Sequence, residues 1–292
     1  MRGPMSDVDE LARRFHDLRP HLTSVGYAML GSLTEAEDAV QESWLRLERV
    51  DADAIDDLRG WLTTVVGRIC LDLLRARRTR PVDYVGTWLP EPLVSEPAER
   101  GPEQQAELAD AVGLALLVVL ENLSPTERLS FVLHDVFAMP FDEVGRIIGH
   151  SAESARQLAS RGRRRVQSSP QPDEDRLAQR RVVDAFLAAA RSGDFAALLD
   201  ILAPDVTLRF DIGPEVNMPD VRGQRDVANR VLSTAPRFIG LARPAIVNGH
   251  AGAVFGTHDE LVSVLDFTVV SGRIAAMNLI VNPAKLRHVA VR

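Results

Sequence analysis

The pattern of apolar and polar positions divides the chain into a helical first part and a mixed second part. Apolar residues recur at spacings of three and four through about residue 167, whereas strand-like alternation is frequent after about residue 205. The segment 168–175 between them is polar and contains two prolines, as linkers often do. A second proline-rich segment, at about 81–102, interrupts the helical part. The pattern therefore predicts two all-α units followed by an α+β domain.

A helix-turn-helix is predicted within residues 124–166. Ser124 is suited to cap a helix, Pro125 to occupy its first position, and Glu127 to bond back to the cap. Two apolar stripes at helical spacing follow, at Leu129, Val132, Leu133 and Val136 and then at Phe141, Val144, Gly145 and Ile148. Residues 149–151 break the pattern, and a third helix is expected to start at Ser151. This order of elements is the geometry that places a helix in the DNA major groove.

The third helix is predicted to have one apolar and one polar face. Its expected buried positions are Ala155, Leu158, Ala159 and Val166. The polar side chains that would face DNA are Glu153, Ser154, Arg156, Gln157, Ser160, Arg161 and Arg164. Residues 141–167 contain six arginines and three acidic residues, although the whole chain has a net charge of −7. Positive charge is thus concentrated where a phosphate backbone would lie. A helical bundle with a solvated charged face is the alternative.

The first helical unit contains a helix with an acidic face. Thr34 to Glu37 form a capping box, and the stripe that follows is Ala36, Val40, Trp44 and Leu47. Asp38, Gln41 and Glu42 face outward. On spacing alone, these three residues indicate either a binding surface or an ordinary solvated face.

A second helix in this unit is basic. From Leu58, the inward positions are Leu62, Val65, Val66, Ile69 and Leu73, and the other side carries Thr64, Arg68, Leu71, Arg75 and Arg78. Residues 59–80 contain six arginines, among them Arg59, and one acidic residue. Trp61 lies near the helix start. A surface that combines cations with an aromatic ring is typical of proteins that bind single-stranded nucleic acid, although Trp61 is equally suited to a core.

These segments, taken in order, resemble a bacterial sigma factor. Residues 38–47 resemble the region-two helix that grips core polymerase, residues 59–75 resemble the segment that melts and reads the minus-ten element, and residues 123–128 with 141–165 resemble region four, which reads the minus-thirty-five element. The presence of only these two regions resembles the extracytoplasmic-function (ECF) group. The resemblance implies core RNA polymerase and promoter DNA as partners, and neither catalysis nor a cofactor or metal. Location in the cytoplasm is expected because the N-terminus lacks the charged-then-apolar order of a signal peptide.

Two departures from the group limit what the resemblance implies. Arg68 stands where many ECF members carry asparagine, and residues 153–156 replace the usual start of the region-four helix. The promoter sequence therefore does not follow from the resemblance.

Two short motifs resemble the ECF subgroup that carries a fused SnoaL-like domain. The linker contains Trp88, Leu89, Pro90, Glu91 and Pro92, which are unusually apolar for a solvated tether, and the chain ends near Asn282, Pro283, Ala284, Lys285 and Leu286. A third motif of the subgroup is poorly matched by residues 211–215. The resemblance implies regulation in cis by the fused domain. We expect the two matched motifs to contribute to the contact between that domain and the sigma regions.

The expected domains are sigma region 2 at 7–82, a linker at 83–108, sigma region 4 at 109–168 and the SnoaL-like domain at 176–292. Within the last, helices are predicted at 182–190 and 195–202, and strands at 205–210, 245–247, 251–255, 261–270 and 273–281. Asn248-Gly249 is a strong hairpin signal, and Ser271-Gly272 divides the last two strands. Helices followed by a curved antiparallel sheet match the NTF2-like fold that SnoaL-like proteins resemble.

That fold leaves two alternatives to a sigma factor open. Asp211, His258, Asp259 and Asp266 are candidates for acid-base chemistry in an isomerase- or cyclase-type enzyme fused to DNA-binding helices. A transcription regulator that binds a small-molecule ligand in the same domain is the other alternative. No membrane contact is expected, because the longest apolar run, 114–120, is too short to span a bilayer. The single cysteine, Cys70, is predicted to be a packing residue.

Overall fold

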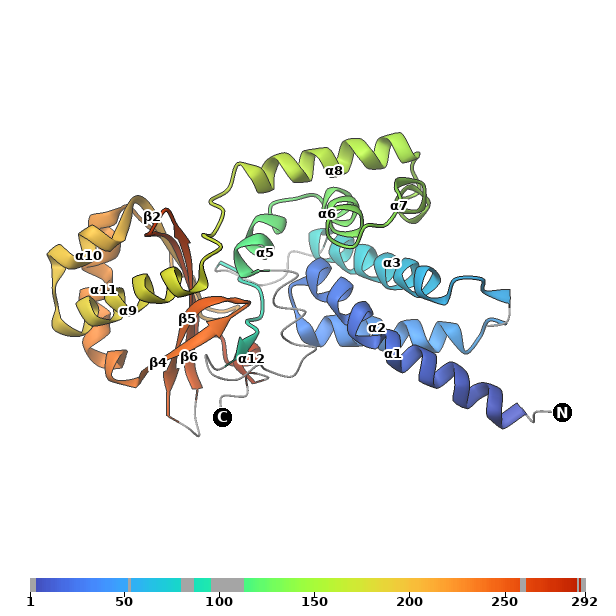
Figure 1. Cartoon of the computed structure of the whole chain (residues 1–292), viewed down its shortest axis with the longest axis horizontal. Helices are drawn as coiled ribbons and strands as arrows, with labels where there is room; N and C mark the ends of the chain where they lie inside the picture. The colour runs from blue at the N-terminus through green and yellow to red at the C-terminus, as the bar shows by residue number, and fades with distance from the viewer. Residues whose placement is uncertain are drawn as a thin grey trace. The chain divides into compact units, whose positions relative to one another are not determined.

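The computed structural model describes residues 4–51, 54–79, 87–95, 113–257, 261–287 and 289 (Figure 1). Their contacts divide the chain into two compact units. The helical unit combines residues 1–81 with 119–166, and the C-terminal unit combines residues 82–118 with 167–292. None of the helices in the described ranges is long and apolar enough to cross a bilayer.

The helical unit begins with three helices, α1 (Pro4–Leu30), α2 (Leu33–Leu47) and α3 (Leu58–Thr79). Gly26 permits close packing of α1 on α2, because a Cβ at this position would lie 2.9 Å from the Cβ of Ala36. The predicted start of α2 was wrong by two residues. Ser32, not Thr34, is the cap, and its hydroxyl accepts a hydrogen bond from the Glu35 amide at 3.3 Å. A hydroxyl side chain therefore caps the helix as predicted, but two residues earlier in the chain.

The helix-turn-helix is present as predicted. It comprises α6 (Pro125–Phe131), a π-helical turn η2 (Val132–Val136), α7 (Phe141–Ile148) and α8 (Ala152–Gln167). The Ser124 capping box is complete. Gly149 ends α7 with a φ of 74°, a conformation that favours glycine. Gly145 lets α7 approach the turn, since a Cβ there would lie 2.7 Å from the carbonyl oxygen of His150.

Helix α3 packs against α6 and α7 as well as against α1 and α2. A Cβ on Gly67 would contact Leu133 and Ile147, and the Arg68 guanidinium donates to the carbonyl oxygen of Arg146 at 3.3 Å. These contacts correct two predicted orientations on α3. Leu71, expected to face outward, is buried, and Leu73, expected to face inward, is 38% exposed. The single-face prediction failed because α3 is covered on two sides.

The C-terminal unit is built on one curved sheet in the order β1-β4-β5-β6-β7-β2-β3. Its strands are β1 (Val94–Ser95), β2 (Leu202–Asp211), β3 (Val221–Arg222), β4 (Ala242–Val247), β5 (His250–Gly256), β6 (Leu261–Val270) and β7 (Arg273–Ile280). Strands β2 and β7 are parallel, and the other pairs are antiparallel. Its helices are α9 (Arg176–Ser192), α10 (Phe195–Ile201), α11 (Gln224–Phe238) and α12 (Pro283–Leu286), with a 3-10 turn η3 (Ile239–Leu241). Helix α5 (Leu114–Leu120) begins in this unit, and its last two residues are assigned to the helical unit.

The predicted α+β architecture with a curved sheet is confirmed, and both hairpin turns lie where the sequence placed them. Asn248 and Gly249 have positive φ values of 46° and 81°, and Ser271 and Gly272 have values of 52° and 73°, as such two-residue turns require. Helix α11 was missed. Its buried residues Val227, Ala228 and Val231 follow helical spacing, but no side chain caps its start and Pro236 lies inside it.

The two faces of this sheet are covered by different parts of the chain. The inner face packs with α9, α10 and α11 around a large apolar core that includes Phe186, Leu208 and Phe267 (Figure 1). The outer face carries a smaller core in which Leu89 and Leu114 pack with Val264, Ile280 and Leu286. The linker between the two sigma-like regions therefore forms part of the C-terminal unit.

Candidate functional site

The polar face of α8 is the first candidate surface. Ala155, Ala159 and Gly162 are buried on its other side, as expected for Ala155 and Ala159. Gly162 fits there because a Cβ would lie 2.9 Å from the Phe131 Cβ. The candidate DNA-reading side chains are exposed at Glu153, Arg156, Gln157, Arg161 and Arg164 and half-buried at Ser154 and Ser160. One continuous polar surface thus runs along the helix.

Several side chains of α8 are pre-oriented by neighbours within the unit. Arg156 forms an ion pair with Glu153 at 2.6 Å, and its guanidinium lies 5.2 Å from the centre of the Phe141 ring. Arg163 instead turns away from the polar face to Asp135, at 2.5 Å. Arg161 lies 3.9 Å from Glu127 of α6, and Arg165 donates to the carbonyl oxygen of Asn122. The arginines of α8 therefore serve both the outward surface and the contacts of α8 with the preceding elements.

The start of α3 holds Arg59 in a defined position. Its guanidinium donates to Nδ1 of His21 at 3.2 Å, and Nε2 of the same ring lies 3.1 Å from the Thr63 hydroxyl. Burial, and secondly the charge of Arg59, lower the pKa of His21 to about 4. The imidazole is therefore neutral at physiological pH and serves as an acceptor for Arg59 without competing charge.

The remaining candidates on α3 are not equally accessible. Arg75 is exposed, and Trp61 and Thr64 are half-buried. Arg68 is exposed but contacts α7. The side chain of Arg78 lies outside the described residues. The basic face predicted for α3 is therefore partly occupied by the region-four helices within the helical unit.

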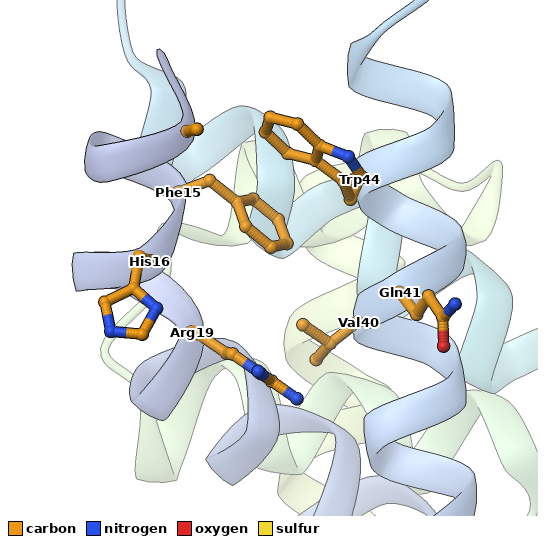
Figure 2. Close-up of a pocket in the computed structure, with 7 residues that line it drawn as sticks. Phe15, His16, Arg19, Val40, Gln41 and Trp44 are labelled. Atoms are coloured by element: carbon orange, nitrogen blue, oxygen red, sulfur yellow. The ribbon is translucent and has the colours of Figure 1, made fainter. Parts of the chain in front are cut away.

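The acidic face of α2 borders a groove of about 320 Å³ between α1 and α2. Figure 2 shows the indole of Trp44 facing the ring of Phe15, with centroids 4.9 Å apart. The same view shows His16 and Arg19 on α1 opposite Val40 and Gln41 on α2. Asp38 and Gln41 are exposed, and Glu42 pairs with Arg46 at 3.0 Å. The candidate polymerase-binding residues thus share one surface beside an aromatic-lined groove.

The linker motif and the C-terminal motif meet at a buried carboxylate, Asp211, which is 1% exposed. Its Oδ2 accepts from the Leu89 amide at 2.8 Å and from Nζ of Lys285 at 2.6 Å. Nζ also donates to the Leu89 carbonyl oxygen and lies 4.0 Å from the centre of the Trp88 ring. We call Trp88, Leu89, Asp211 and Lys285 the linker dock. Asp211 belongs to the poorly matched third motif, so that motif still makes a contact here.

Backbone pairing extends the linker dock along the sheet. Leu93 exchanges two hydrogen bonds with Asn248, at 2.7 and 3.0 Å, and β1 then pairs with β4. Pro90, Glu91 and Pro92 are buried, and the Thr87 hydroxyl donates to Asp220 at 3.1 Å. Asn282 caps α12, and its backbone N–H donates a hydrogen bond to the carbonyl oxygen of Asp211 at 3.0 Å. The sequence indicated Asn248 only as a hairpin residue and did not single out Asp220, so neither was expected to contact the linker.

Pro283 and Leu286 complete the C-terminal motif. Pro283 occupies the first turn of α12, and Leu286 is buried in the outer-face core. This placement follows from the cap at Asn282, which fixes the short helix and aims Lys285 at Asp211.

The inner face of the sheet contains a cavity of about 220 Å³. Its lining includes Phe186, Leu208, Phe210, Leu265 and Met277, and Arg230 is the only charged side chain among the described lining residues. The cavity is thus almost wholly apolar.

The acid-base candidates do not line this cavity. Side chains alternate along β2 and β6, so Asp211 and Asp266 face away from the cavity, which Phe210 and Leu265 line. Asp266 is buried on the outer face, where its carboxylate accepts a hydrogen bond from the side-chain amide of Asn278 at 2.9 Å. Burial raises the pKa of Asp266 to about 6, against smaller opposite effects of Asn278 and Arg209. His258 and Asp259 lie outside the described residues.

Comparisons with known proteins agree with this arrangement. The Sigma-70 region 2 family model matches residues 14–80, and the Sigma-70, region 4 model matches residues 113–166. The chain is 39% identical to the ECF RNA polymerase sigma factor SigJ of Mycobacterium tuberculosis, over 93% of this chain and 91% of that protein. It is 35% identical to the probable ECF RNA polymerase sigma factor SigI of the same organism, over 97% of each.

A solved structure extends the likeness to the three-dimensional arrangement of most of the chain. The crystal structure of M. tuberculosis SigJ matches with a TM-score of 0.76 at 38% identity, covering 94% of this chain and 98% of that one. The alignment thus extends over both the helical unit and the C-terminal unit. The chain belongs to the ECF RNA polymerase sigma factors.

Proposed function

We propose that this sigma factor recognises its promoter in two parts, through the polar face of α8 and through the basic side of α3. A sigma factor is a specificity subunit rather than an enzyme, and its two sigma-70 regions imply binding to RNA polymerase and promoter DNA. The proposal assigns the minus-thirty-five contacts to the outward residues of α8 and the minus-ten contacts to Arg59, Trp61, Thr64, Arg68, Arg75 and Arg78. Since core polymerase acts in the cytoplasm, we place the protein there.

The single observation that carries the promoter proposal is the exposed face of α8 with Arg156 and Arg161. Replacing either with alanine should weaken promoter binding by about 1–3 kcal/mol, and the loss should depend on promoter sequence if the side chain contacts bases. Arg163→Ala is the matched control because Arg163 turns away from this face to Asp135. Arg156 and Arg161 stay exposed on it, although they also have acidic partners in Glu153 and Glu127. Equal effects of all three substitutions on every promoter would refute a base-reading role for α8.

We assign polymerase binding to Asp38, Gln41 and Glu42. They share the exposed side of α2, next to the groove of Figure 2. Asp38→Arg should weaken the complex with core polymerase, measured by co-purification or fluorescence anisotropy. Glu37→Arg makes the same charge change on the same helix outside the assigned set. If the two variants bind core polymerase equally well, the assignment is refuted.

Regulation in cis by the C-terminal domain is supported by the position of the linker. Within the helical unit, α3 packs on α6 and α7, and Arg128 of α6 donates to the carbonyl oxygen of Ala28 in α1. The chain that joins region two to region four runs through the linker dock. Holding the linker on the sheet therefore shortens the free tether between the two regions, which opposes their separation on polymerase.

Run-off transcription with core polymerase tests this proposal. Trp88→Ala and Lys285→Met should release the linker and raise transcription relative to the wild-type protein at equal core occupancy. Arg287→Met is the control, because Arg287 is exposed two residues beyond Lys285. Comparison of the full chain with residues 1–170 tests sigma activity and cis regulation together. Unchanged transcription by both dock variants would refute the proposed role of the dock.

The apolar cavity favours one further function, the binding of a small molecule by the C-terminal domain. Its volume of about 220 Å³ exceeds the roughly 150 Å³ of an engineered apolar cavity that stays dry and binds benzene. Isothermal titration of the full chain with small amphiphiles tests this function. Turnover is not part of the proposal, because the carboxylates of Asp211 and Asp266 face away from the cavity.

A further inference from the structure

The cavity of the C-terminal unit has an apolar interior and, among its described lining residues, one charged side chain, Arg230 on α11. Arg230, Thr234 and Phe238 all line it, and their spacing of four residues places them on one face of the helix. Thr234 and Phe238 are exposed, and Arg230 is half-buried. The opposite lining, from Phe186, Leu208 and Leu265, is buried. The cavity therefore opens along α11.

Arg230 carries the only charge among the described lining residues, and it is not neutralised. In the described part of the chain it forms no ion pair, and its guanidinium lies 5.8 Å from the centre of the Phe210 ring, which also lines the cavity. A cation over an aromatic face keeps its positive charge while its stem covers apolar surface. An unpaired guanidinium at the mouth of an apolar cavity attracts an anionic group, with which it can form two parallel hydrogen bonds.

From this geometry we infer that the cavity binds a small amphiphilic anion, with its apolar part inside and its carboxylate or similar group at Arg230. The inference rests on the small-molecule function proposed above and adds the charge of the ligand. A volume of about 220 Å³ suits a tail of about eight carbons or a substituted aromatic ring, given that roughly 150 Å³ suffices for benzene. The hydroxyl of Thr234, one turn beyond Arg230, also lines the cavity but donates to the Arg230 carbonyl oxygen at 2.9 Å, so the anion is assigned to the Arg230 guanidinium.

Three probes with the same tail test the inference on the full chain: octanoate, octanol and octylamine. Calorimetric titration should give the tightest binding for octanoate, at least about threefold tighter than octanol, as expected for a partly solvated ion pair, and the weakest for octylamine. Arg230→Gln should remove the preference while octanol still binds. Arg237→Gln, an exposed position on the same helix that does not line the cavity, is the matched control and should leave the preference intact.

The outcomes separate the two proposals. If octanoate and octanol bind equally to the wild-type protein, or if Arg230→Gln keeps the preference, the anionic ligand class is refuted although the cavity binds. If none of the three probes binds, the small-molecule function itself is refuted.

The site of binding requires its own control. Ala190→Phe fills the cavity from α9 and should abolish binding of all probes, and the smaller Ala190→Leu should weaken it if the first variant does not fold. Unchanged binding by a folded variant would place the ligand outside the cavity and overturn the inference.

Discussion

The buried ion pair of the linker dock yields a prediction whose size follows from the structure. Asp211 is 1% exposed and has two close donors, Lys285 at 2.6 Å and the Leu89 amide at 2.8 Å. Lys285→Met removes the charge but keeps most of the apolar stem. Breaking a buried pair by removing one partner typically costs about 3–5 kcal/mol, because the other charge stays buried. We expect a loss near the lower value, since the Leu89 amide still solvates the carboxylate.

The pair is separated from other effects of substitution by a double-mutant cycle. Asp211→Asn leaves the lysine with the Leu89 carbonyl oxygen and the Trp88 ring, so it should also destabilise the dock. The double variant leaves no unpaired buried charge. Its loss should therefore be smaller than the sum of the two single losses, by about 2 kcal/mol. Arg287→Met provides the control for loss of a positive charge at the end of the chain.

Amide hydrogen exchange is the suitable assay because it reports the local opening of the linker rather than the unfolding of a multidomain chain. A loss of about 3 kcal/mol corresponds to exchange of the Leu89 amide that is about 150-fold faster in Lys285→Met. Additive effects in the cycle, or exchange at Leu89 that stays at the wild-type rate in both single variants, would refute the argument that the ion pair holds the linker.

Three other predictions concern separate parts of the molecule. Because the pKa of Asp266 is about 6 against an ordinary 3.8, the folded state retains a proton that the unfolded state loses between these pH values. The free energy of unfolding should therefore fall as the pH rises from about 4 to 6, by up to about 3 kcal/mol. Asp266→Asn should flatten that part of the pH profile in urea unfolding, and parallel profiles would contradict the assignment. Burial raises the pKa of Cys70 to about 12, so Ellman's reagent should modify it only as the protein unfolds, and rapid labelling of the native chain would show that the thiol is accessible. Gly145→Ala should destabilise the helical unit by about 1–3 kcal/mol, because its Cβ would lie 2.7 Å from the His150 carbonyl oxygen. Gly240→Ala is the control, because a Cβ at that position would have nothing within 4 Å. Equal melting temperatures of the two variants would argue against a close approach at the turn.

Local patterns in the sequence were sufficient for the elements that are governed by local chemistry. The capping box at Ser124, the turn at Gly149 and the hairpin at Asn248-Gly249 each depend on a few neighbouring residues, and all three are present. The same holds for the polar face of α8, because helical spacing alone separates its two sides. Helix α11 lacks a side-chain cap and contains a proline, so its local signals were weak.

The predicted orientation of side chains was wrong where an element packs against more than one partner. The exchange of Leu71 and Leu73 on α3 arose because α6 and α7 cover a second side of the helix, and spacing along one helix carries no information about a distant partner. The candidate acid-base groups are a similar case. Asp211 and Asp266 are residues of ordinary catalytic type, but the alternation of β2 and β6 places them on the face opposite the cavity.

The sequence by itself thus determined the two sigma regions, the class of the third domain and the unusual apolar character of residues 88–92. Tertiary structure alone decided what those residues contact. Leu89 and Lys285 are 196 positions apart and meet at Asp211 because the sheet brings the ends of β2 and β7 together. A buried charge is stable only with its partner in place, and that pairing depends on the fold of the whole C-terminal unit.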